Sequence, residues 1–293
     1  MSAIKTMSLT KNYGEHTAVR ALDLAVESGS VYGFLGPNGS GKTTTVKMLL
    51  GMKAPSDGDA WVLGFDCRQQ SIEICKRIGY VPENGNLYPA MTVGETISLV
   101  KSLRPSWDQV LAKKLLDTFE LPTSRKVGKL SKGMQRQLAL ALAMAPRPEL
   151  LILDEPTSGL DPVKRHDFLQ ILMDNVAETG QTVFFSSHNM SEVERTADTV
   201  GIIHQGRLVV SGGLEELKTK VKRVRVVLPN ASHLTLTTPI RKIEGGHGQW
   251  LITVDQEADE IMLELRKLHP TVLEAYDLSL EDVFMIYAGG DAK

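Results

Sequence analysis

Residues 36–43, Gly-Pro-Asn-Gly-Ser-Gly-Lys-Thr, constrain the fold of this chain more than any other stretch. The apolar residues 31–35 before it predict a buried strand, and residues 44–50 after it predict a helix that ends at Gly51. A strand, a glycine-rich loop ending in Lys-Thr and a helix are the context that a phosphate-binding loop requires. We therefore predict a P-loop α/β fold in which residues 36–43 bind the phosphates of a nucleotide.

The residue types in this loop have separate tasks. The glycines let the backbone fold tightly with its N–H groups pointing inward, and the following helix adds the positive end of its dipole. Lys42 supplies a positive charge for the β and γ phosphates, and Thr43 supplies a hydroxyl for Mg²⁺. The predicted nucleotide-binding residues of this segment are Gly36, Pro37, Asn38, Gly39, Ser40, Gly41, Lys42, Thr43 and Thr44.

Length, charge, cysteine count and apolar runs argue against a nucleic-acid-binding, disulfide-rich or membrane-spanning protein. The 293 residues suit one or two domains, and the formal net charge of −2 gives no basic field for nucleic acid. The two cysteines, Cys67 and Cys75, are too few for a disulfide framework and badly spaced for a zinc site, so we expect a reducing cytosol. The N-terminus lacks the features of a signal peptide, and the longest apolar run, residues 138–145, is too short to cross a bilayer. We expect a soluble protein that reaches a membrane only through a partner.

Within the first 147 residues, the predicted secondary structure changes at about residue 84 from strands with turns to helices. Residues 3–35 alternate apolar runs with turns and predict an antiparallel β layer. Residues 84–147 predict helices: Thr92 with Glu95, and Ser106 with Gln109, have the spacing of a capping box. Apolar residues between 107 and 119 recur at helical spacing, which predicts a core-facing helix.

Polar side chains follow two aliphatic strands further along the chain. Asp154 and Glu155 come directly after residues 150–153, and the strand predicted at residues 182–185 is followed by Ser186, Ser187 and His188. Open α/β sheets bind their ligands at the carboxyl ends of strands. We expect Asp154 to lie near Mg²⁺ and Thr43, Glu155 to face an attacking water, and His188 to approach a γ-phosphate.

Residues 221–293 follow a different sequence pattern from residues 1–220, and we predict that they form a small α+β domain. Strands are expected at residues 224–228, 234–237 and 250–254, and a helix at residues 259–269. The basic run at residues 218–225 has two interpretations, a patch for lipid or RNA and a solvated helix end with a strand face. We favour the second.

Six ordered motifs within residues 3–218 resemble the nucleotide-binding subunits of ABC transporters. Tyr13 matches the aromatic that stacks on adenine, and residues 36–43 match the Walker A loop. Residues 130–134, Leu-Ser-Lys-Gly-Met, match the signature motif, and residues 150–154 match Walker B with Glu155 at the catalytic position. Residues 158–161 match the D-loop, and His188 matches the switch histidine.

This resemblance implies a P-loop ATPase core with a mixed sheet, an antiparallel β subdomain and a helical subdomain at about residues 84–147. It implies a Mg²⁺-dependent ATPase that works as a homo- or heterodimer. The P-loop of one subunit faces Ser131 and Gly133 of the other, and both donate to the γ-phosphate. Catalysis would rest on Glu155, His188 and Lys42. The expected partner is an integral membrane permease, which would hold the protein at the cytoplasmic face of the membrane, and no nucleic acid is expected.

Three positions depart from the family pattern: Glu83 replaces a glutamine, Lys132 a glycine and Met134 a glutamine. A carboxylate at position 83 suits Mg²⁺ or a water molecule, so we include Glu83 with Thr43 and Asp154 as a metal-site residue. Lys132 suits either a partner's phosphate or solvent. The Val-Pro-Glu loop, the Lys-Gly-Met signature and residues 279–284 resemble the drug- and antibiotic-exporter, or ABC-2, subgroup.

Three alternatives to an exporter ATPase remain open at this point. An importer ATPase with a regulatory tail differs in its membrane partner. A soluble ABC ATPase acting on ribosomes or DNA usually has two cassettes or a coiled-coil insertion, and neither occurs here. A non-catalytic binding module would not need Lys42, Asp154, Glu155 and His188 together.

Overall fold

The computed structural model describes every residue except 1, 86, 230–232, 256–257 and 289–293. The chain forms two compact units, Met1–Ser211 and Gly212–Lys293. The predicted boundary lies at residue 220, whereas helix α8 (Leu214–Lys220) belongs to the second unit. No helix within the described residues is both long and apolar enough to span a bilayer.

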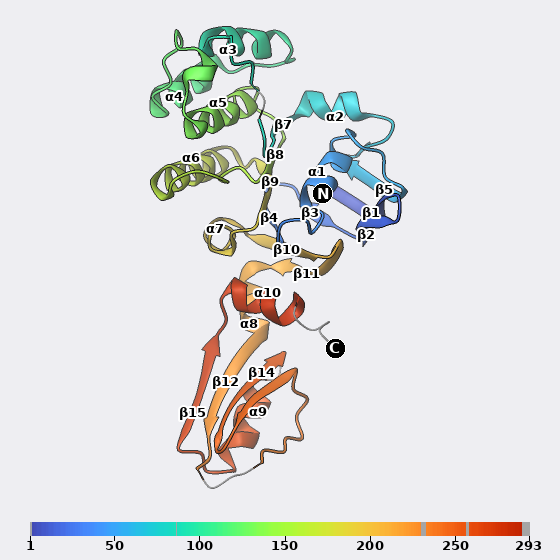
Figure 1. The fold of residues 1–293 in the computed structure, drawn as a ribbon, viewed down its shortest axis with the longest axis vertical. Coiled ribbons are helices and arrows are strands. Elements are labelled where there is room, and N and C mark those ends of the chain that lie inside the picture. The colour runs from blue at the N-terminus through green and yellow to red at the C-terminus, as the bar shows by residue number, and fades with distance from the viewer. Residues whose placement is uncertain (1, 86, 230–232, 256–257, 289–293) are drawn as a thin grey trace. The chain divides into compact units, whose positions relative to one another are not determined.

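A six-stranded sheet, β11-β10-β4-β9-β8-β7, forms the centre of the first unit (Figure 1). Five of its strands run parallel, so their carboxyl ends meet at one edge. All residues of β4 and β8 are buried, as the predicted aliphatic runs require. The bounds are β4 (Val31–Leu35), β7 (Ile78–Val81), β8 (Leu150–Asp154), β9 (Thr182–Ser187), β10 (Thr199–His204) and β11 (Arg207–Gly213).

An antiparallel sheet lies beside helix α1 (Lys42–Leu49), as predicted for the N-terminal residues (Figure 1). One apolar cluster joins this sheet to the central sheet, because Val26, Val46 and Phe184 are buried within it. The P-loop helix is thereby held between the two sheets. The elements are β1 (Ser2–Tyr13), β2 (His16–Leu22), β3 (Ala25–Glu27), β5 (Asp57–Val62) and β6 (Phe65–Asp66), with helix α2 (Ser71–Arg77) before β7.

Helices occupy the chain between β7 and β8, as predicted, and two local predictions can be compared with them. Thr92 and Glu95 form the expected capping box. The Ser106 prediction was wrong: Asp108 caps α4, and the Ser106 hydroxyl donates to the carbonyl of Pro146 at 2.6 Å. Val110, expected in the core, is 80% exposed, because α4 buries its other face. The helices are α3 (Val93–Ser102), α4 (Gln109–Thr118), a 3-10 turn (Val127–Lys129) and α5 (Lys132–Met144); α6 (Pro162–Thr179) and α7 (Met190–Thr196) follow later.

The second unit is an antiparallel sheet with the order β13-β14-β12-β15. Helix α9 covers one face, where Val224, Ile252 and Ile261 share an apolar core. The strand expected at residues 234–237 does not form; Thr237 and Thr238 there donate to the carboxylate of Glu264 on α9. The elements are β12 (Val221–Val227), β13 (Lys242–Gly246), β14 (Gln249–Asp255), α9 (Ala258–Arg266), β15 (Val272–Asp277) and α10 (Leu280–Ala288), of which β13, β15 and α10 were not predicted.

Candidate functional site

The P-loop connects β4 to α1 at the carboxyl edge of the central sheet, and two of its positions admit only glycine. A Cβ on Gly36 would lie 2.3 Å from the carbonyl oxygen of Ile203. Gly41 has a φ of +113°, and a Cβ there would lie 2.5 Å from the carbonyl oxygen of Ala18. The close approach of neighbouring backbone therefore fixes the loop shape that begins α1 at Lys42.

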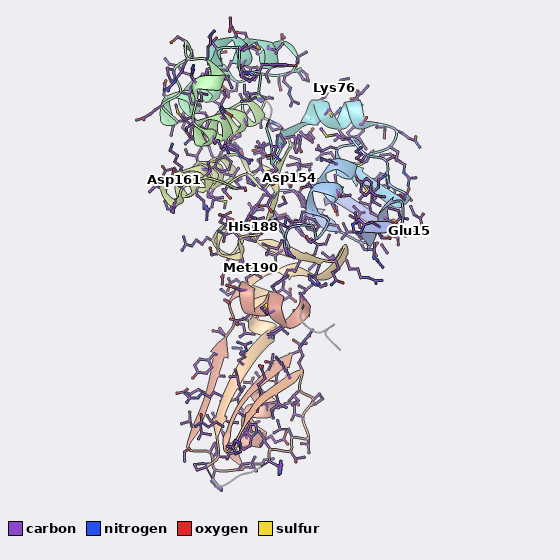
Figure 2. The ribbon with its side chains drawn as sticks, in the orientation of Figure 1. Glu15, Lys76, Asp154, Asp161, His188 and Met190 are labelled. Carbon is purple, nitrogen blue, oxygen red and sulfur yellow. The ribbon has the colours of Figure 1, made fainter. Side chains whose placement is uncertain are left out.

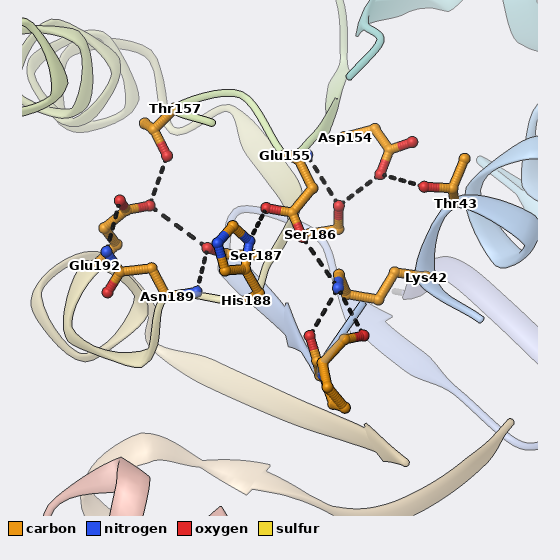
Figure 3. Close-up of polar contacts among 12 residues, drawn as sticks. Lys42, Thr43, Asp154, Glu155, Thr157, Ser186, Ser187, His188, Asn189 and Glu192 are labelled. Carbon is orange, nitrogen blue, oxygen red and sulfur yellow. Dashed lines mark hydrogen bonds and ion pairs between the residues drawn. The ribbon is translucent and has the colours of Figure 1, made fainter. Parts of the chain in front are cut away.

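The ammonium group of Lys42 is buried, with 6% of its side chain exposed. Its Nζ donates to the carbonyl oxygens of Gly36 at 2.7 Å and Pro37 at 3.2 Å. It also lies 3.0 Å from Oε1 of Glu155 (Figure 3). The loop carbonyls and one carboxylate thus aim this charge at the edge where β4 and β8 end.

Asp154 and Thr43 are placed to share a divalent cation. The Thr43 hydroxyl donates to Asp154 Oδ1 at 3.3 Å, and the Ser186 hydroxyl donates to the same oxygen at 2.6 Å (Figure 3). Asp154 Oδ2 is buried and has no hydrogen-bond partner among the described residues. A free carboxylate oxygen beside a hydroxyl fits Mg²⁺, which takes few protein ligands and completes its shell with phosphate and water.

Glu155 faces a different direction from its neighbour Asp154 because of its backbone. Its φ is +47°, in the left-handed region that non-glycine residues rarely adopt, and such strain gathers at functional sites. Its N–H donates to the Ser186 hydroxyl at 3.0 Å. Its buried carboxylate lies between Lys42 and His188, with Oε2 at 2.8 Å from His188 Nδ1 (Figure 3). The side chain of His188 itself (labelled in Figure 2) is 48% exposed, so it can turn toward a ligand.

A cavity of about 420 Å³ lies at this edge and brings several predicted residues together. Tyr13, at the end of β1, lines one part with 45% of its surface exposed. Glu83 and Glu155 also line the cavity. Burial, together with the negative charges of Asp154 and Glu83, raises the pKa of Tyr80 to about 12. The lining residues are Tyr13, His16, Ala18, Asn38, Gly39, Gly41, Lys42, Thr43, Thr44, Glu83 and Glu155.

Ser131 and Gly133 do not line this cavity. Ser131 caps α5, and its hydroxyl accepts from the N–H of Met134 at 3.2 Å, which places it at a helix N-terminus as predicted. Lys132 is exposed there. Within one chain the predicted phosphate donors therefore fall in two places, the P-loop and the start of α5.

Sequence reasoning missed Arg136 and Ser186. Arg136 Nη1 donates to the carbonyl oxygens of Pro82 at 3.1 Å and Glu155 at 3.3 Å, which ties α5 to both strand ends. Burial lowers the pKa of Arg136, while Glu83, Asp154 and Glu155 oppose that shift. Ser186 holds Asp154 and Glu155 together, and its place two residues before His188 is the one signal in the sequence.

Comparisons with known proteins agree with this geometry. The family model described as ABC transporter matches residues 19–158. The bacitracin transport ATP-binding protein BcrA of Bacillus licheniformis is 38% identical over 75% of this chain and 72% of its own length. The ABC transporter ATP-binding protein YtrB of Bacillus subtilis is 28% identical over 99% of both chains.

Solved structures give the same result. The ATP-binding subunit of an ABC transporter superposes with a TM-score of 0.68 at 26% identity, over 74% of this chain and 92% of its own. A dimeric bacterial ABC transporter cassette, MJ0796, superposes with a TM-score of 0.65 at 26% identity, over 72% of this chain and 98% of its own.

Proposed function

The chain belongs to the ABC transporter family as an ATP-binding subunit with ATPase activity, and from this premise we propose that it drives export through a membrane permease. The bacitracin transport protein BcrA and the probable multidrug ATP-binding protein YbhF of Escherichia coli, 35% identical over 75% of this chain and 38% of its own length, support export over import. The permease would hold the protein at the cytoplasmic face of the membrane. The transported compound is set by residues of that partner.

The arrangement of Lys42, Glu155 and His188 is the observation that carries the proposed mechanism. The P-loop N–H groups and Lys42 bind the phosphates of ATP, and Tyr13 stacks on the adenine. Mg²⁺, held by Thr43 and Asp154 with Glu83 close by, would neutralise phosphate charge during the reaction. The second carboxylate, Glu155, is then free to take a proton from the attacking water.

His188 positions the reacting group in this mechanism. Its ring contacts Glu155 on one side, at 2.8 Å, and is half exposed on the other. An N–H of the exposed side can donate to the γ-phosphate while the ring still orients the base. Lys42, Glu155 and His188 are accordingly the catalytic residues that we assign.

The second part of the proposal concerns assembly. Ser131 and Gly133 stand at the start of α5, away from the P-loop cavity of their own chain. The helix N-terminus offers hydrogen-bond donors for an anion, so we assign these residues to the γ-phosphate held by a second cassette. Each complete site then needs two chains, either two copies of this one or this chain with a relative.

A mixing experiment tests this assembly in two copies of the chain. Lys42→Ala removes the phosphate charge, and Ser131→Arg blocks the start of α5. Neither variant alone should hydrolyse ATP, whereas the mixture should recover activity, because a mixed dimer retains one intact P-loop opposite one intact α5. An inactive mixture, with wild-type protein active under the same conditions, would contradict the composite site. Stimulation of the wild-type ATPase by a co-expressed permease tests the export role separately.

A further inference from the structure

Glu192, on α7, is a buried carboxylate outside the nucleotide cavity, with 5% of its surface exposed. Its Oε2 accepts from the Thr157 hydroxyl at 2.6 Å and from the Ser187 hydroxyl at 3.4 Å (Figure 3). Its Oε1 accepts from Asn189 Nδ2 at 3.0 Å and lies 3.0 Å from Arg165 Nε. Four side chains from three segments therefore converge on one carboxylate.

The partners of Glu192 flank the groups that the mechanism uses. Ser187 and Asn189 are the neighbours of His188 on either side. Thr157 lies two residues after Glu155, at the start of the connection from β8 to α6. Arg165 is in the first turn of α6. The carboxylate thus joins the backbone on both sides of the histidine to the segment that follows the catalytic glutamate.

A cavity of about 430 Å³ lies between α6 and α7 beside these contacts. Arg165 and Glu192 line it from opposite helices. A charged group is buried stably only when it is paired and hydrogen-bonded, and Glu192 meets that condition through these four partners. These polar contacts link α7 to α6 and to the segment after β8, next to the site.

We propose that Glu192 is a positioning residue for ATP hydrolysis, which holds the residues on either side of His188 to Thr157 and Arg165. It touches neither nucleotide nor metal; it holds the His188 backbone at the distance from which Nδ1 reaches Glu155. The inference rests on the roles proposed above for His188 and Glu155. Loss of these contacts lets the histidine and the connection to α6 move separately, so hydrolysis falls while nucleotide binding persists.

Hydrolysis and binding are measured on the full-length protein carrying Glu192→Gln or Thr157→Val. Glu192→Gln removes the charge opposite Arg165, and Thr157→Val removes the 2.6 Å donor with little change in shape. We expect each to lower kcat by about 10- to 100-fold, the usual result of a small misplacement, and to change the Kd for ATP by less than about twofold. Thr157→Ser, which restores the hydroxyl, should recover kcat. Glu178→Gln, at an exposed carboxylate on α6, is the matched control and should match wild type.

Unchanged kcat in Thr157→Val would overturn the proposal, and so would a loss of ATP binding equal to the loss of kcat, since that result indicates a purely structural role. The double variant Glu192→Gln/Thr157→Val gives a further test. Because the two residues contact each other, its loss of kcat should be smaller than the two single losses combined. Glu155→Gln, assayed in parallel, reports on the base assignment alone. Full hydrolysis in that variant would remove the proposed mechanism, whatever Glu192 does.

Discussion

The two units of this chain differ in the charged side chains that they bury: the first buries several, and the described part of the second buries none. In the first, Lys42, Asp154, Glu155 and Glu192 are all buried, within reach of one sheet edge. In the second, Thr253 is the one buried polar side chain among the described residues, and the core is aliphatic with Trp250. Burying charge lowers stability unless each group is paired. In the first unit, the buried charged groups are the ones that would react with or bind the nucleotide, together with Glu192, a positioning residue. The second unit has the apolar core of an ordinary α+β domain.

Several basic side chains of the second unit form ion pairs with carboxylates at its surface. Lys222 contacts Asp277 at 2.9 Å, and Arg223 contacts Asp282 of α10 at 3.0 Å. The basic run at residues 218–225 is therefore matched by carboxylates of β15 and α10. This favours the solvated interpretation of that run over a binding patch.

The largest expected effect tests the buried charge of the first unit. Lys42→Ala removes the ammonium that contacts Glu155 and the loop carbonyls. We expect hydrolysis to fall by about 10²- to 10³-fold, as on loss of one strong electrostatic contact in a site. A radiolabelled ATP assay measures this. Hydrogen exchange in β12 and β14 should remain as in wild type, and altered exchange there would weaken the contrast between the units.

A core substitution in the second unit should raise hydrogen exchange in that unit and leave ATP binding by the first unit unchanged. Ile252 is fully buried on β14, and Ile252→Ala leaves a cavity that destabilises this unit by about 2–5 kcal/mol. Hydrogen exchange should then rise across β12, β14 and α9. ATP affinity should stay the same, since every residue that lines the nucleotide cavity belongs to the first unit. Loss of ATP binding in this variant would break the comparison.

A smaller effect concerns pH in the second unit. Hydrogen bonds from Thr237 and Thr238 lower the pKa of Glu264 to about 2, below its ordinary value of about 4.3. The ionised form is therefore favoured on folding, so this stabilisation is present above pH 4.3 and is lost as the pH falls toward 2. Glu264→Gln should lower Tm at pH 7, and the difference from wild type should shrink below pH 4. Glu260→Gln, exposed on the same helix, should leave Tm unchanged at both values.

The first unit was the more predictable of the two because its strands end in polar residues. The four aliphatic residues before Asp154 predicted a buried strand, and burial did place that carboxylate beside Thr43. The orientation of Glu155 was not predictable in the same way. It depends on a left-handed φ, which non-glycine residues rarely adopt and which the local sequence does not predict.

The second unit shows where periodicity fails. Residues 234–237 alternate apolar and polar side chains, as a strand would. The hydroxyls of Thr237 and of the next residue, Thr238, instead donate hydrogen bonds to Glu264 on α9, and this segment is a loop. Strands β13 and β15 are mostly exposed along their length, so they carry no hydrophobic run to recognise. Side chains such as Glu192 are also invisible in sequence, because an isolated glutamate on a short helix resembles any surface residue.

The central claim is that Glu155 is the base that cuts ATP, and Glu155→Gln tests it most directly. The substitution keeps the shape of a side chain that lies between Lys42 and His188, and it removes the proton acceptor. ATP turnover and ATP affinity should be measured on the same purified protein. We predict that turnover falls by at least about 10²-fold while ATP stays bound. Turnover at the wild-type rate would contradict the account.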